Sequence, residues 1–200
     1  MKKTILALVA AFLFSAVSSY AATILFDLQG KAGTGLLSGN ENGAIAGTPG
    51  SGGEIGSGIS FDDVSLVLTL NIGWGTGNGF TNLSGNATAG HIHGPTASGG
   101  VGSFTQNAGV LISLDTLPSW NSNATSGGLV NGTVTLTSTQ ATDLLAGKFY
   151  VNAHTAINGG GEIRGNLIVA PEPTAIGLFA FGLASIFLLR CKKKGFVNNS

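Results

Sequence analysis

Short runs in which apolar and polar residues alternate fill the middle of the chain. Alternation with a period of two places every second side chain on one face, which predicts half-buried β-strands. In residues 64–72 one face carries Leu66, Leu68, Leu70 and Ile72. The strands predicted in this way cover residues 22–29, 64–72, 87–93, 110–115, 129–137, 148–155 and 161–169.

Glycine-rich segments separate these strands. Residues 30–58 contain few apolar side chains, which predicts a long loop or a pair of weak strands. The sequence GWGTGNGF at 73–80 is expected to end the strand before it.

One short helix is expected between the strands. Thr137 and Gln140 form a capping-box pattern, residues 141–146 continue as helix, and Gly147 ends it. Together these elements predict an all-β fold, an antiparallel β-sandwich or Greek-key domain with one short helix.

The N-terminus carries an export signal. Lys2 and Lys3 precede an apolar run at 5–17, and Ser19 and Ala21 supply the small residues of a cleavage site. Residues 1–21 are therefore predicted to be a secretory signal peptide.

The C-terminal segment, residues 171–200, is expected to anchor the chain in a membrane. Residues 174–189 carry no charge and would form a helix about 24 Å long, short for a hydrocarbon core of about 30 Å. A basic cluster follows, which predicts a cytoplasmic end and places the rest of the protein outside. That cluster comprises Arg190, Lys192, Lys193 and Lys194.

Residues 22–170 remain for one domain, and their charge excludes one class of partner. They contain three basic and eight acidic residues, a formal net charge of −5. An acidic domain lacks the electrostatic footprint of nucleic-acid binding. The single cysteine, Cys191, lies beyond the domain. The stability of the domain must therefore come from packing and strand pairing without a disulfide.

The three histidines are candidate metal ligands. His91 and His93 alternate on one predicted strand, so both imidazoles point to the same side. His154 on a neighbouring strand would complete a three-nitrogen site for Zn²⁺ or Cu²⁺, in a redox-active form if copper binds. The alternatives are a structural role, in which the histidines hydrogen-bond across a polar face, and contact with a protein or polysaccharide ligand.

A hairpin centred near Asn158 would place polar partners beside His154. Its register pairs His154 with Glu162, which would orient this histidine or act as a fourth ligand. The same register extends the polar face through two further pairs, Asn152 with Arg164 and Tyr150 with Asn166.

Other chemistry is sparse. No GxSxG elbow and no cysteine nucleophile occurs in the domain, so we expect no enzymatic activity. Trp74 and Trp120 either cover the ends of the core or offer exposed rings to sugars.

Three ordered blocks resemble the CHRD domain, first described in chordin. They are GHIHGP at 90–95, LLAG at 144–147 and KFYVNAHTAINGGGEIRGNL at 148–167. Gly90 stands where many members have alanine. The resemblance implies a binding or structural module without established enzymatic activity.

The C-terminal segment resembles the PEP-CTERM sorting signal, with Pro171, Glu172 and Pro173 ahead of the apolar helix and basic cluster. This resemblance implies cleavage by an exosortase, a transient anchor in the inner membrane, and association with biofilm and extracellular polysaccharide. We therefore expect an exported, surface-directed, non-catalytic component of the envelope or polysaccharide matrix, with polysaccharide or surface proteins as partners. The alternative function is a metal-binding domain that uses His91, His93 and His154, with a metal-dependent enzyme as the catalytic form of this alternative.

Overall fold

The computed structural model describes residues 22–38, 45–122 and 124–171. Its strands are β1 (Thr23–Gly30), β2 (Gly33–Thr34), β3 (Gly52–Glu54), β4 (Ile59–Asp62), β5 (Val67–Trp74), β6 (Ala87–His93), β7 (Val110–Ser113), β8 (Gly128–Thr135), β9 (Tyr150–Thr155) and β10 (Ile163–Val169). Its helical segments are η1 (Thr76–Asn78), η2 (Gly100–Ser103), α2 (Ala124–Gly127) and α3 (Ser138–Leu145).

The predicted terminal signals lie mostly outside these residues. The signal peptide at 1–21, the rest of the sorting segment after Pro171 and the helix at 174–189 all fall there. None of the helices in the described segments has the length and hydropathy that crossing a bilayer requires.

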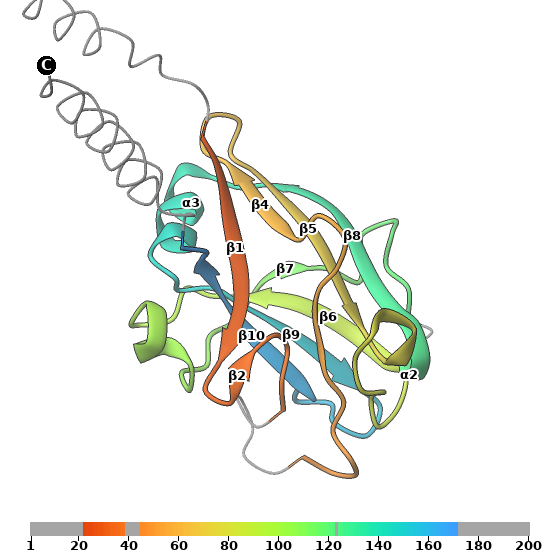
Figure 1. Ribbon diagram of the computed structural model, residues 1–200. Helices are drawn as coiled ribbons and strands as arrows, with labels where there is room; N and C mark the ends of the chain where they lie inside the picture. Colours follow the sequence, from red (N-terminus) through yellow and green to blue (C-terminus); the bar gives the residue numbers. More distant parts are fainter. Residues whose placement is uncertain (1–21, 39–44, 123, 172–200) are drawn as a thin grey trace, which may run out of the picture. The chain divides into compact units, whose positions relative to one another are not determined.

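The strands form one antiparallel sheet in the order β3-β5-β4-β1-β10-β9-β6-β7, with β2 added to β1 and β8 added to β5 (Figure 1). The first and last strands pair in the middle of this order, from Phe26 opposite Val169 to Gln29 opposite Asn166. Buried residues from both halves of the sheet belong to one hydrophobic core, as in a sandwich. The all-β prediction is confirmed.

Alternation predicted the inward face of β5 correctly for three of its four residues. Leu68, Leu70 and Ile72 are fully buried. Leu66 instead takes a positive φ of 58° one residue before the strand begins. The predicted break at residue 73 is wrong, because β5 continues to Trp74 by pairing with both β3 and β8.

The single predicted helix corresponds to α3. Thr137 accepts a hydrogen bond from the Gln140 backbone, and the Gln140 side chain accepts one from the Thr137 backbone, so the capping box is present. Gly147 follows the helix at φ 68°, the left-handed conformation that suits glycine. The shorter segments η1, η2 and α2 were not predicted.

Strands β6, β9 and β10 carry the residues singled out in the sequence, and their two faces differ. Ile92, Val151 and Ala153 belong to the hydrophobic core. The opposite, polar face is also covered, because the Arg164 guanidinium donates to the backbone oxygens of Ser103 (3.0 Å) and Gln106 (2.9 Å). A loop therefore closes over part of this face.

Candidate metal centre

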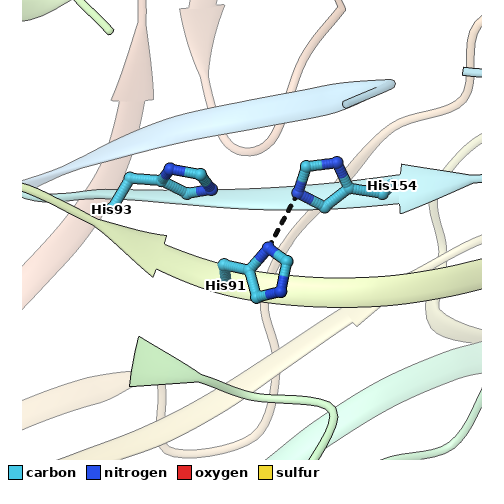
Figure 2. A group of neighbouring side chains, drawn as sticks. All are labelled: His91, His93 and His154. Atoms are coloured by element: carbon cyan, nitrogen blue, oxygen red, sulfur yellow. Dashed lines mark hydrogen bonds between the residues drawn. The ribbon is translucent and has the colours of Figure 1, made fainter. Parts of the chain in front are cut away.

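The three histidines meet on the polar face where β6 and β9 pair. In the register of these strands, Ala89 lies opposite His154 and His91 lies opposite Asn152, so all three imidazoles share one region. Each histidine contributes one ring nitrogen to a group of three, and these three nitrogens all lie within 4.8 Å of one another. Figure 2 shows the three rings turned toward a common point.

The outer nitrogens of two histidines face backbone carbonyls. His93 Nδ1 lies 2.9 Å from the Ala108 oxygen, and His154 Nδ1 lies 3.0 Å from the Gly159 oxygen. A carbonyl only accepts hydrogen bonds, so each Nδ1 carries the proton of its neutral ring. The Nε2 atoms of both rings are then left with lone pairs, as metal ligation requires.

The inner nitrogens, which are the ring nitrogens that face the other histidines, lie close to one another. His91 Nδ1 is 3.0 Å from His154 Nε2, which holds a lone pair. A proton on His91 Nδ1 makes this a hydrogen bond in the metal-free protein. His93 Nε2 is buried and finds no hydrogen-bond partner among the described residues, an arrangement that costs free energy.

These distances fit a tetrahedral ion once side-chain movements bring the more distant nitrogens together by up to about 1.5 Å. Zn–N bonds of about 2.0–2.1 Å place two ligand nitrogens about 3.3 Å apart. The shortest separation, 3.0 Å, is near this value, and the longest, 4.8 Å, must close by about 1.5 Å. Three neutral imidazoles suit Zn²⁺ or Cu²⁺ and leave one position for water.

Tyr150 and Arg164, predicted as supporting residues, buttress His93. The His93 and Tyr150 rings stack with centroids 4.9 Å apart and planes 7° apart. The Arg164 guanidinium carbon lies 3.5 Å from the Tyr150 ring centroid. The predicted pairing of Arg164 with Asn152 across β9 and β10 is confirmed.

The predicted contact between Glu162 and His154 is wrong. Although the hairpin has the predicted register, the Glu162 carboxylate turns to a different set of donors. It accepts hydrogen bonds from the Gly50 and Ser84 backbones and from the side chains of Ser84, Thr155 and Asn158. Gly161, the residue before Glu162, adopts φ 115°.

These donors control the charge of Glu162. Burial by itself raises the pKa of the carboxyl, but the hydrogen bonds from Ser84, Gly50 and Thr155 outweigh it and hold the pKa below its ordinary value. Glu162 is therefore a charged anchor for the loop that presents the Gly159 oxygen to His154.

The tryptophans belong to the core side of the domain. Trp74 is 2% exposed, and its ring lies 5.3 Å from that of Trp120. Trp74 thus presents no ring to a sugar. Trp120 packs over Gly90, where a Cβ atom would come within 2.5 Å of the indole, which explains glycine at this position.

Sequence reasoning missed the acceptors around the histidines. The Ala108 and Gly159 oxygens are backbone groups, and no side-chain pattern marks them. Asp115 was visible only as the end of a predicted strand, yet its Oδ1 lies 3.8 Å from His91 Nε2.

The fold and the site together define an antiparallel β-domain with a three-histidine cluster on its polar face. Residues 34–167 match the CHRD domain model, so the chain belongs to the CHRD-domain family. No curated protein and no solved structure matches the chain.

Proposed function

We propose that this CHRD domain binds one transition-metal ion, Zn²⁺ or Cu²⁺, through His91, His93 and His154. The convergence of one nitrogen from each ring within 4.8 Å carries the proposal. Two of the rings are held by carbonyls in the tautomer that leaves the inner nitrogen unprotonated. A structural framework needs no such convergence of lone pairs.

Metal analysis of the purified domain, residues 22–170, tests this function. After EDTA treatment and reloading with Zn²⁺ or Cu²⁺, we expect one ion per chain, and His91→Ala, His93→Ala and His154→Ala should each lose it. Thr88→Ala is the matched control, because Thr88 is exposed on the same strand as His91. Substoichiometric metal that ignores the histidine variants would support the structural role instead.

The cellular setting proposed for this domain is the outside of the cell. CHRD domains are generally extracellular, which agrees with the export signal read at residues 1–21. We propose that the PEP motif at 171–173 and the segment after it direct the chain to an exosortase. Replacing Pro171 and Pro173 by alanine should leave the precursor uncleaved in cells that process the parent chain, and equal processing would contradict sorting by this motif.

We further propose a non-catalytic role in the envelope or polysaccharide matrix. The resemblance of residues 171–200 to the PEP-CTERM signal, which is associated with extracellular polysaccharide, supports this assignment. Retention of the exported chain by cell-surface polysaccharide, compared with and without bound metal, tests it. A chain that never sediments with the polysaccharide would contradict the matrix role.

A further inference from the structure

We infer that Asp115 belongs to this metal centre as the acceptor that orients His91 and tunes its affinity for the ion. The inference rests on the proposed function and deepens it. It would make the centre a set of three imidazoles, each with its outer nitrogen directed to an oxygen: two neutral carbonyls and one carboxylate.

The position of the carboxylate supports this assignment. Asp115 Oδ1 lies 3.8 Å from His91 Nε2, on the side of the ring opposite the nitrogen that faces His154. This oxygen is buried and accepts no hydrogen bond from any residue in the described segments. A buried carboxylate oxygen without a donor is costly, so a protonated His91 Nε2 is the partner it lacks.

The backbone holds Asp115 beside His91. Ser113 on β7 pairs with His91 on β6, and the Gly90 oxygen then accepts hydrogen bonds from the backbones of both Leu114 (2.7 Å) and Asp115 (3.4 Å). Leu114 is buried in the core and fixes the chain at this point. The carboxylate thus lies in the turn after β7, which backbone hydrogen bonds tie to β6.

Metal binding moves the single proton of His91 toward this carboxylate. In the metal-free protein Nδ1 carries the proton that bonds to His154. If an ion took the Nδ1 lone pair, the proton of the neutral ring would reside on Nε2, and Asp115 Oδ1, now 3.8 Å away, would accept it after an approach of about 1 Å. Such a carboxylate fixes the tautomer and raises the basicity of the ligand. Its negative charge also offsets part of the charge that three neutral imidazoles leave on the ion.

Titration of the full chain with Zn²⁺ and Cu²⁺ tests the inference through Asp115→Asn. We expect one ion per chain still, bound about 10–100-fold more weakly than by the parent. Asp27→Asn removes the same charge from an exposed position on β1 and should bind as the parent does. Circular dichroism of both variants checks that the fold is retained.

Spectra of the copper-loaded chains separate an orienting role from direct ligation. If Asp115 orients His91, the electron paramagnetic resonance spectrum of Asp115→Asn retains three nitrogen ligands and shifts only slightly in its hyperfine splitting. Loss of an oxygen ligand from the parent's X-ray absorption spectrum on substitution would overturn the orienting role. Equal affinities of Asp115→Asn and the parent would overturn the inference while leaving the histidine site intact. If the parent itself bound no metal, the proposed function would fail first.

Discussion

His91 Nδ1 and His154 Nε2 lie 3.0 Å apart, on neighbouring strands whose pairing sets their separation. Two imidazole nitrogens this close are bridged by a hydrogen bond in the metal-free protein and would be bridged by the ion in a metal centre. His93 Nε2, buried without a partner in the described residues, adds a third lone pair to the same space. This relationship supports the proposed metal centre.

The first prediction concerns thermal stability. An ion that binds only the folded chain should raise the melting temperature by about 5–10 °C at 100 times its dissociation constant, because this adds about 2.7 kcal/mol to the free energy of unfolding. Differential scanning calorimetry with Zn²⁺ measures the shift. His154→Ala should remove it, and an equal shift in that variant would point to nonspecific binding.

The second prediction concerns pH and Glu162. Folding lowers the pKa of this carboxyl from its ordinary value of 4.5. Glu162 therefore contributes its full stabilisation at pH values above 4.5, and this stabilisation disappears as the pH falls through the lower pKa of the folded chain. At pH 7 the free energy of unfolding of Glu162→Gln should therefore be roughly 1.5–3 kcal/mol below that of the parent. As the pH falls, the parent loses this contribution, so the difference between the two chains should shrink.

Urea denaturation of Glu162→Gln and the parent at pH 7, 4 and 3 checks this. Asp27→Asn serves as the control for an exposed carboxylate. Parallel losses of stability with falling pH in Glu162→Gln and the parent would show that Glu162 is not the titrating group.

The third prediction concerns Gly90. A Cβ atom at this position would lie 2.5 Å from the nearest atom of the Trp120 ring. Gly90→Ala should therefore destabilise the domain by about 1–3 kcal/mol. The double variant Gly90→Ala/Trp120→Phe should recover part of this loss, because the smaller ring leaves room for the methyl group. Chemical denaturation measures both, and a Gly90→Ala chain as stable as the parent would contradict the close packing.

The fourth prediction concerns the buried cation. The Arg164 guanidinium contacts two backbone oxygens, the Asn166 side chain and the Tyr150 ring, a planar arrangement that a lysine cannot reproduce. Arg164→Lys should cost about 2–4 kcal/mol. Hydrogen exchange should also quicken at residues 103–108, and unchanged exchange there would show that Arg164 does not hold this loop.

The sequence predicted the strands of the site well, for a clear reason. Strands β6, β9 and β10 each turn one face to the hydrophobic core, so apolar residues recur at every second position and fix both the strand and its phase. The same phase placed Ile92 in the core and the three histidines on one side. Strand β4 was missed because its four residues lie between glycine-rich and acidic loops.

The partners of the site were harder to predict. Glu162 lies one residue before β10 begins, and its donors come from distant loops at Gly50 and Ser84 as well as from the hairpin itself. The carbonyls of Ala108 and Gly159 carry no side-chain signal. Asp115 reaches His91 only because β7 joins the edge of the sheet beside β6, a pairing that no local pattern reveals.

X-ray absorption spectroscopy of the metal-loaded chain identifies the ligands of the proposed centre. We expect three imidazole nitrogens at about 2.0–2.1 Å from one Zn²⁺ ion, with the imidazole scattering lost in His93→Ala. A spectrum dominated by oxygen ligands, or one unchanged by that substitution, would contradict a metal centre built from His91, His93 and His154.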